Sequence, residues 1–262
     1  MPTSVVEYPL SPKYIPSWTI TEALRELIAN ALDTKTRLKF RWADGYGYIT
    51  DHAPGIPKSY WVLGEGAHGV IGQFGEGLKL AVLVLARESR DACVETVGYS
   101  VRPSLCHSTT FDTNLLALEY SDNSRLLGTE VKIQCSEDEF VHAQALFLKL
   151  VPFPVLHKGL GIIDAPGQVY VNGVFVQSMN SVWGYNIKDK SLSNRDRSIL
   201  NNRLLSDTIA KILSDLNKVS LIIQLLTTVV NDRDASNASR YQEEQVYFRI
   251  RSINQRLWKR AF

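Results

Sequence analysis

The chain has 262 residues, of which 45% are hydrophobic and 21% are charged, and its formal net charge at pH 7 is +2. This composition is typical of a globular protein, and the length suits one large domain or two small ones. The balanced charge argues against an obligate nucleic-acid-binding protein, although it leaves room for a local basic patch.

The three cysteines show neither metal-ligand spacing nor an even count, which favours a reduced, cytoplasmic protein. The N-terminus lacks the basic and apolar regions of a signal peptide. The longest apolar stretch, residues 219–230, is too short to span a bilayer. We therefore expect no membrane partner.

Apolar periodicity predicts the elements of the first part of the chain. Residues 1–19 are expected to be extended, as an arm. The next elements are a helix at 20–34 that Thr21 can cap, strands at 38–42 and 46–50 that turn at Asp44-Gly45, a long loop at 52–77, and an apolar helix at 78–88. Strands at 93–101, 108–119 and 129–135 follow, and then a helix at 137–150 that begins after Ser136. The first part is therefore predicted to be an α+β sandwich with an antiparallel or mixed sheet.

A second region begins near Gly161, and we place the domain boundary between residues 1–158 and 159–262. The sequence predicts, in order, a hairpin at 168–177 around Asn172-Gly173, a polar loop at 180–198, and helical patterns at 199–230 and 241–258.

Polar residues form a stripe along the first predicted helix. Glu22, Glu26, Asn30 and Asp33 follow one another at spacings of four, four and three. Such a stripe is most often the solvated face of an amphipathic helix. Asn30 weakens that reading, because Asn in mid-helix costs about half a kcal/mol relative to Ala.

Two further motifs carry candidate chemistry. The segment DHAPGI, residues 51–56, is either a surface turn or a site where Asp51 accepts a hydrogen bond and Gly55 lets the backbone approach a ligand. The segment GQFGEGLK, residues 72–79, places three glycines before a helix, where backbone N–H groups can hold phosphates. It contains no Walker A pattern, and a glycine triplet alone is a weak signal.

The order of these motifs is more specific than any one of them. A helix with E-x3-N-x2-D, a strand that ends in D-x3-G, and G-x2-G-x-G-x-K at a helix start resemble the GHKL superfamily of gyrase B subunits, heat-shock chaperones, MutL-like proteins, MORC proteins and histidine kinases. Gly128-Thr129 resembles the threonine element of that pocket. Ala53 departs from the pattern, because the family usually has glycine there.

The resemblance implies a Bergerat-type fold, a mostly antiparallel sheet with helices on one face, that binds ATP and Mg²⁺. Glu26 would be the general base for the attacking water, Asn30 would hold the Mg²⁺, and Asp51 would bind the adenine amine. Lys79 would approach the phosphates and is a second catalytic candidate. The implied nucleotide contacts are Asn30, Asp33, Asp51, Gly55, Ile56, Gly72, Gln73, Phe74, Gly75, Glu76, Gly77, Leu78, Lys79 and Thr129.

Glu26 also makes the chain more similar to the MutL, gyrase and MORC ATPases than to histidine kinases, which generally lack this glutamate. The implied activity is ATP hydrolysis, in which a lid at residues 57–71 closes and drives a conformational change or homodimerisation. One alternative is a switch or scaffold that binds ATP and ADP with little hydrolysis. A second alternative is a DNA-binding module in which ATP regulates the binding of DNA.

The hairpin at 168–177 resembles the start of the transducer domain of that family, followed here by a helical C-terminal region. Lys188 and Lys190 are candidates, by position only, for a contact with the terminal phosphate. A basic C-terminal helix could bind DNA or a protein partner, or could pack on the domain with its charges in water. Its cations are Arg249, Arg251, Arg256, Lys259 and Arg260.

Overall fold

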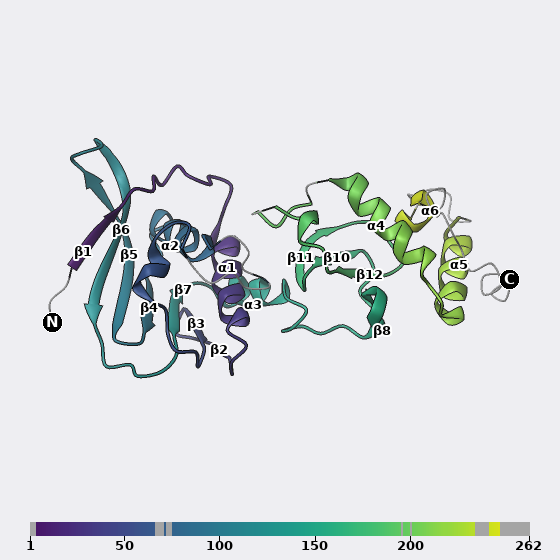
Figure 1. The fold of residues 1–262 in the computed structure, drawn as a ribbon, viewed down its shortest axis with the longest axis horizontal. Helices are drawn as coiled ribbons and strands as arrows, with labels where there is room; N and C mark the ends of the chain where they lie inside the picture. Colours follow the sequence, from purple (N-terminus) through teal and green to yellow (C-terminus); the bar gives the residue numbers. More distant parts are fainter. Residues whose placement is uncertain are drawn as a thin grey trace. The chain divides into compact units, whose positions relative to one another are not determined.

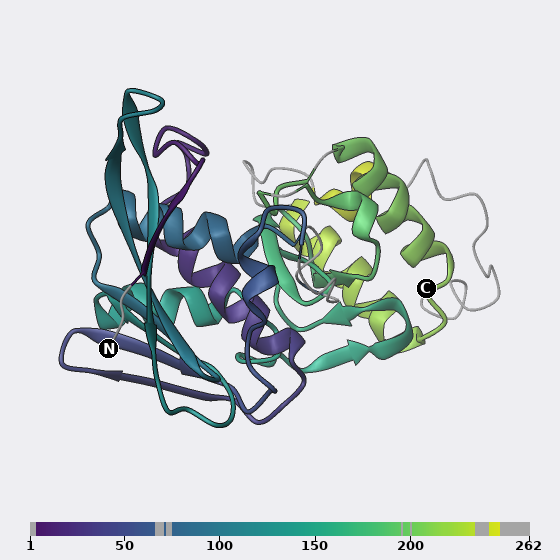
Figure 2. The ribbon, with the colours of Figure 1, turned by 60° about the vertical axis from the view of Figure 1, so that its left-hand side comes forward.

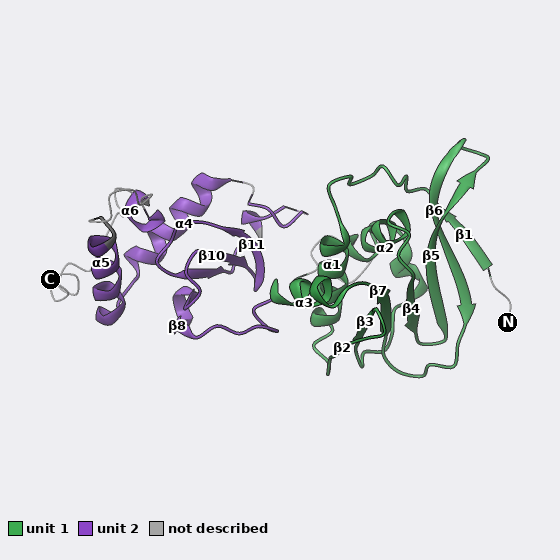
Figure 3. Cartoon of the chain, turned by 180° about the vertical axis from the view of Figure 1, so that it is seen from behind, with its two compact units in different colours: residues 1–146 green, residues 147–262 purple. Residues whose placement is uncertain are grey.

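The computed structural model describes residues 4–65, 71, 75–194, 196–199, 201–233 and 241–246. The chain divides into two compact units, residues 1–146 and 147–262 (Figure 3). The division lies earlier than the predicted boundary after residue 158. Phe147 forms a β-bridge with Val174, and the N–H of Leu148 donates to the carbonyl of Gly173 at 2.9 Å, so this segment packs with the second unit.

A seven-stranded antiparallel sheet forms the first unit, in the order β1-β6-β5-β4-β7-β3-β2. The strands are β1 (Ser4–Tyr8), β2 (Lys39–Ala43), β3 (Tyr46–Thr50), β4 (Ala92–Thr96), β5 (Tyr99–Ser108), β6 (Thr113–Asp122) and β7 (Glu130–Gln134). The helices α1 (Ile20–Asp33), α2 (Gly77–Arg87) and α3 (Glu137–Ala145) lie together over one face of it (Figures 1 and 2). The predicted α+β class is confirmed.

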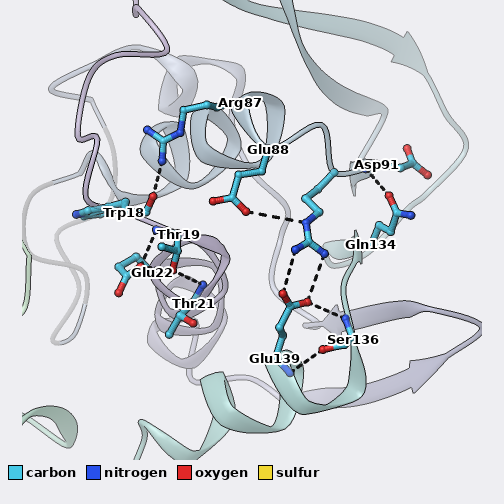
Figure 4. A network of polar contacts seen from close by, with 11 residues as sticks. Trp18, Thr19, Thr21, Glu22, Arg87, Glu88, Asp91, Gln134, Ser136 and Glu139 are labelled. Carbon is cyan, nitrogen blue, oxygen red and sulfur yellow. Dashed lines mark hydrogen bonds and ion pairs between the residues drawn. The ribbon is translucent and has the colours of Figure 1, made fainter.

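Helix α1 begins at a capping box. The hydroxyl of Thr19 accepts a hydrogen bond from the N–H of Thr21 at 3.3 Å, and the carboxylate of Glu22 accepts one from the N–H of Thr19 at 2.7 Å (Figure 4). The cap is therefore Thr19 and not the predicted Thr21, which is a donor inside the first turn. The arrangement also gives Glu22, the first member of the polar stripe, a structural role.

Helix α2 is buried along almost its whole length, from Leu80 to Ala86, because it packs against both α1 and the sheet. Near its C-terminus the guanidinium of Arg87 donates to backbone carbonyls of the N-terminal segment, Pro12, Tyr14, Ile15 and Trp18. The N-terminal segment is consequently fixed to α2, and its first strand, β1, pairs with β6.

Helix α3 packs directly on strand β3. A Cβ atom at Gly47 would lie 2.6 Å from the ring of Phe140, so only glycine allows this contact. Ser136 caps the helix as predicted, and Arg90 pairs with Glu139 at 3.0 Å (Figure 4). The helix ends at Ala145 and not at the predicted residue 150, because the following residues bridge to the second unit's hairpin.

Two predicted turns are confirmed and two turns were missed, at Gly98 and at residues 109–112, inside the predicted strand at 108–119. Asp44-Gly45 and Asn172-Gly173 have the positive φ values, 53° and 81° and then 52° and 82°, of two-residue hairpin turns. The predicted strand at 93–101 is instead two strands, β4 and β5, which separate at Gly98 with φ +79°.

The second unit has a five-stranded sheet in the order β11-β10-β12-β9-β8, with β10 and β12 parallel. Its strands are β8 (Val155–His157), β9 (Ile162–Ile163), β10 (Gln168–Val171), β11 (Val174–Ser178) and β12 (Gly184–Ile187), and its helices are α4 (Asn202–Ser214), α5 (Val219–Arg233) and α6 (Gln242–Val246). The predicted hairpin at 168–177 is confirmed as β10 and β11. The polar loop predicted at 180–198 is wrong in part, because β12 lies within it and both Trp183, just before the strand, and Tyr185 are buried.

The helical pattern at 199–230 corresponds to two helices, α4 and α5, and the pattern at 241–258 begins with the short α6. The basic residues of that last pattern, from Arg249 to Arg260, lie outside the described residues. Within the described ranges, no helix has both the length and the apolar character that crossing a bilayer requires.

Candidate functional site

The carboxylate of Asp51 lies directly after strand β3 and is fixed by its neighbours. Its Oδ1 atom accepts hydrogen bonds from the N–H of Ala53 at 2.8 Å and from the N–H of Thr129 at 3.3 Å. Only 8% of the residue is exposed. No hydrogen bond to Oδ2 is formed within the described part of the chain, so this oxygen remains available as an acceptor.

The Asp51 turn packs closely on the residues before β7. The N–H of Asp51 donates to the carbonyl of Thr129 at 2.9 Å, and the N–H of Gly128 donates to the carbonyl of Ala53 at 2.8 Å. A Cβ atom at Gly128, whose φ is +76°, would lie 2.1 Å from the carbonyl oxygen of Asp51. Gly128 and Thr129 therefore pack tightly against the Asp51 turn, although the two segments are far apart in the sequence. The turn accommodates Ala53, whose N–H donates to Asp51.

Thr96, at the end of β4, also contacts these residues, although no motif in the sequence indicates it. Its hydroxyl lies 3.1 Å from that of Thr129 and accepts the N–H of Ile56 at 2.7 Å. The carbonyl of Ile56 accepts the hydroxyl of Tyr99 at 2.7 Å, and burial raises the pKa of that phenol. Both the backbone N–H and the backbone carbonyl of Ile56 are thus hydrogen-bonded. Gly55 has a positive φ, and it lets this segment lie against β4 because it has no side chain. A Cβ there would be 2.9 Å from the Thr96 hydroxyl oxygen.

Glu26 is buried in the middle of α1, with 5% of the residue exposed. Its Oε1 atom pairs with Nε of Arg25 at 3.1 Å, and the guanidinium of Arg25 lies 5.5 Å from the centre of the Trp18 ring. The Oε2 atom faces the start of α2, where a Cβ at Gly77 would lie 2.6 Å from it. The solvated-stripe interpretation therefore fails at Glu26, and its carboxylate lies at the positive end of the α2 dipole.

The other two stripe residues lie near the end of α1. Both carboxylate oxygens of Asp33 accept the N–H of Ile71 at 3.0 Å, so Asp33 orients the backbone of the long loop. Asn30 is half-buried, and the described residues form no hydrogen bond with its side chain. Its amide oxygen is available as a ligand.

Lys79 is 2% exposed, and its ammonium donates to the backbone carbonyls of Glu65, at 2.6 Å, and Gly75. Burial lowers the pKa of Lys79 from its usual value, and the nearby Glu76 carboxylate partly offsets this. The Lys79 ammonium thus links two backbone positions of the long loop, Glu65 and Gly75, in this structure. The predicted contacts Gly72, Gln73 and Phe74 lie outside the described residues, while Gly75, Glu76, Gly77 and Leu78 are half-buried around the start of α2.

The described residues contain no group of three or more His, Cys, Asp or Glu side chains that could hold a metal ion. Mg²⁺ commonly binds through one or two protein oxygens together with substrate phosphates, and Asn30 beside the buried Glu26 fits that mode. In the second unit, Lys188 is exposed directly after β12.

Comparison with known proteins adds one relative and no family. No family model matches the chain. An uncharacterized protein of Mycoplasma pneumoniae (strain ATCC 29342 / M129 / Subtype 1) is 27% identical over 232 residues, which cover 77% of this chain and 94% of that protein. The similarity therefore covers most of both proteins, but it assigns no activity to this chain.

Proposed function

We propose that the first unit is a Bergerat-type domain that binds ATP with Mg²⁺ and hydrolyses it. The observation that carries the proposal is the state of Asp51, a buried carboxylate with one oxygen fixed by two backbone N–H groups and the other oxygen available. A group of this kind is suited to accept a hydrogen bond from the exocyclic amine of adenine. The order of the elements, from α1 through the β3 turn and the glycine loop to β7, agrees with the resemblance.

In this proposal the side chains take the roles that the resemblance implies. Asp51 accepts the adenine amine, and the Thr129 hydroxyl, fixed by Thr96, lies beside it. Asn30 would hold Mg²⁺, which supplies charge neutralisation at the phosphates. Glu26 accepts the proton of the attacking water, and Arg25 balances its charge in the buried site.

The loop before α2 contributes phosphate contacts in this proposal. The N-terminus of α2 and the backbone N–H groups of Gly75 to Gly77 favour negative charge. Closing of the loop over the nucleotide would require Lys79 to leave the carbonyls of Glu65 and Gly75. This exchange is the conformational step that a partner or a second copy of the chain could use.

A second candidate is an ATP-binding switch with little turnover. It is favoured by the Glu26–Arg25 pair, because Oε1 is already engaged and a general base needs an oxygen within reach of water. The two candidates share the nucleotide pocket and differ only in what Glu26 does.

The proposal is tested by titrating wild type and Asp51→Asn with Mg-ATP in a calorimeter. An asparagine oxygen can keep the Ala53 and Thr129 contacts, so the variant changes mainly the available oxygen into a donor. We expect its affinity to fall roughly tenfold to a hundredfold, since a hydrogen bond to a charged group is lost. Asp112→Asn, in the exposed β5–β6 turn, is the matched control and should bind like wild type. Equal affinities for all three proteins would refute the adenine assignment.

A further inference from the structure

Four cations alternate along the segment that leads into and through the edge strand β2. Lys35, Arg37, Lys39 and Arg41 occupy every second position, and all four are exposed. Lys39 and Arg41 lie opposite Thr50 and Tyr48 of β3. Gly47 faces Phe140 of α3, and neighbouring strand residues point to opposite faces, so Lys39 and Arg41 lie on the sheet face away from the helices. Alternate strand residues are about 6.6 Å apart, so Lys39 and Arg41 are regularly spaced on this face, and Lys35 and Arg37 precede them in the segment before β2.

These cations differ from Arg102 and Arg125, which pair with acidic side chains of the same sheet face. Among the described residues, none of the four takes part in an ion pair. Three acidic side chains of the face are paired elsewhere: Asp91 with Arg102 at 3.1 Å, and Glu95 and Glu130 with Arg125 at 3.5 and 3.8 Å. The β2 edge therefore carries an unneutralised positive charge although the whole chain is nearly neutral.

Two tyrosines lie among the cations. The guanidinium of Arg41 lies 3.8 Å from the centre of the Tyr48 ring, and the ammonium of Lys132 lies 4.0 Å from that of Tyr46. Tyr48 lies between Arg41 and Lys132 in the register of β2, β3 and β7. Lys39, Arg41, Tyr46, Tyr48 and Lys132 are called the β2 corner below.

We propose that the β2 corner binds single-stranded nucleic acid. Lys39 and Arg41, with Lys35 and Arg37 beside them, contact successive phosphates. An unpaired base stacks on the outer plane of the Arg41 guanidinium, or on Tyr46 after the flexible Lys132 side chain moves to a phosphate. The inference does not depend on ATP binding, which concerns the opposite, helix-covered side of the sheet.

The aromatic groups decide between this partner and other polyanions. Duplex DNA and anionic lipid surfaces attract cations but offer no exposed base to stack. Cations on an edge strand also discourage pairing between sheets, and that role needs no tyrosine on the adjacent strand. Tyr48 supports the Arg41 guanidinium on which a base stacks, so a contribution of Tyr48 to binding is specific to the proposal.

The test is fluorescence anisotropy of a labelled 20-nucleotide oligothymidylate, without ATP, over a range of salt concentrations. The variants are Lys39→Gln with Arg41→Gln, Lys35→Gln with Arg37→Gln, and Tyr48→Leu. The matched control is Arg203→Gln with Lys211→Gln, which removes the same charge from exposed positions on α4. All variants must keep the wild-type circular dichroism spectrum to be compared.

We expect wild type and the α4 control to bind alike. Each β2 pair should weaken binding and flatten the slope of log K against log salt concentration by about 1.4. Tyr48→Leu should weaken binding on the order of tenfold with the slope unchanged. The proposal is overturned if wild type does not bind at low salt, or if the α4 control loses as much affinity as the β2 pairs. It is also overturned if a duplex or an anionic phosphatidylserine vesicle competes as well as the unlabelled oligonucleotide.

Discussion

The carboxylate of Glu26 lies so close to Gly77 that a Cβ atom at position 77 would come within 2.6 Å of Oε2. Gly77 is the first residue of α2, and its φ is not positive, so an added Cβ there would disturb the contact with Glu26 and not the backbone conformation. The pair links the middle of α1 to the start of the helix that the glycine loop precedes. In the proposed function it joins the general base to the phosphate-binding segment.

Gly77→Ala should therefore displace Glu26. We expect a loss of stability of about 1–3 kcal/mol from overpacking, and a loss of turnover of about 100-fold if the carboxylate moves by an ångström. Gly159→Ala is the control, because the nearest atom to a Cβ there is 3.7 Å away. Urea unfolding and phosphate release measure the two effects. An alanine variant with wild-type stability and turnover would show that the contact is not maintained.

Arg25 and Glu26 should be strongly coupled in stability. Both side chains are buried, so Arg25→Gln removes the cation that pairs with the buried Glu26 carboxylate and should cost about 3–5 kcal/mol. The double variant Arg25→Gln with Glu26→Gln should recover most of that loss. A double-mutant cycle by urea unfolding gives the coupling energy, and additive single effects would show that the pair does not form in solution.

Thr96→Val should loosen the Asp51 turn. The substitution keeps the shape of the side chain but leaves the N–H of Ile56 without its acceptor, which costs about 1–3 kcal/mol. Because Thr129 loses its partner too, the affinity for Mg-ATP should fall as well. Thr113→Val, at an exposed position of β6, should change neither property. Thermal unfolding and calorimetric titration check this, and an unaffected Thr96→Val would separate Thr96 from the site.

Glu243 should make the second unit's stability depend on pH. Its carboxylate accepts the Tyr185 hydroxyl at 2.6 Å and the N–H of Val182 at 3.1 Å, and burial raises its pKa above the usual 4.5. Above pH 4.5 the unfolded chain releases this proton before the folded chain does, so the folded state binds more protons and loses stability as pH rises.

The comparison is Glu243→Gln, which cannot ionise. Relative to wild type, the variant should gain stability as pH rises from about 4.5 to the raised folded pKa of Glu243, and the difference should then level off. Urea unfolding at a series of pH values between about 4 and 8 measures it. A constant difference across that range would contradict the raised pKa.

Local signals in the sequence predicted much of the first unit. The apolar periodicity of α1 and α2 and the Asp-Gly and Asn-Gly turns each depend on neighbouring residues alone. Residues typical of strands continue through Val97, so the turn at Gly98 was not predicted. Phe147 continues a helical pattern in the sequence but forms a β-bridge with Val174 in the structure. These two errors arise because contacts distant in sequence decide where the elements end.

The site shows the same limit. Glu26, Asn30 and Asp51 could be identified as candidates from their motifs. Arg25 could not, because adjacent helix residues do not normally face each other and an Arg-Glu dipeptide has no special meaning. Thr96 lies in a strand without a motif, and only the sheet brings it beside Thr129.

The most direct test of the account is the initial rate of phosphate release from Mg-ATP by wild type and by Glu26→Gln. It should be measured at protein concentrations where calorimetry shows equal nucleotide occupancy. Glu137→Gln, at an exposed position of α3, is the control for loss of a carboxylate. The account predicts release by wild type and Glu137→Gln and a loss of at least about 100-fold in Glu26→Gln. Equal release by Glu26→Gln and wild type would contradict the assignment of Glu26 as the base. If all three proteins bind ATP and none releases phosphate, the ATP-binding switch replaces ATP hydrolysis as the proposed function.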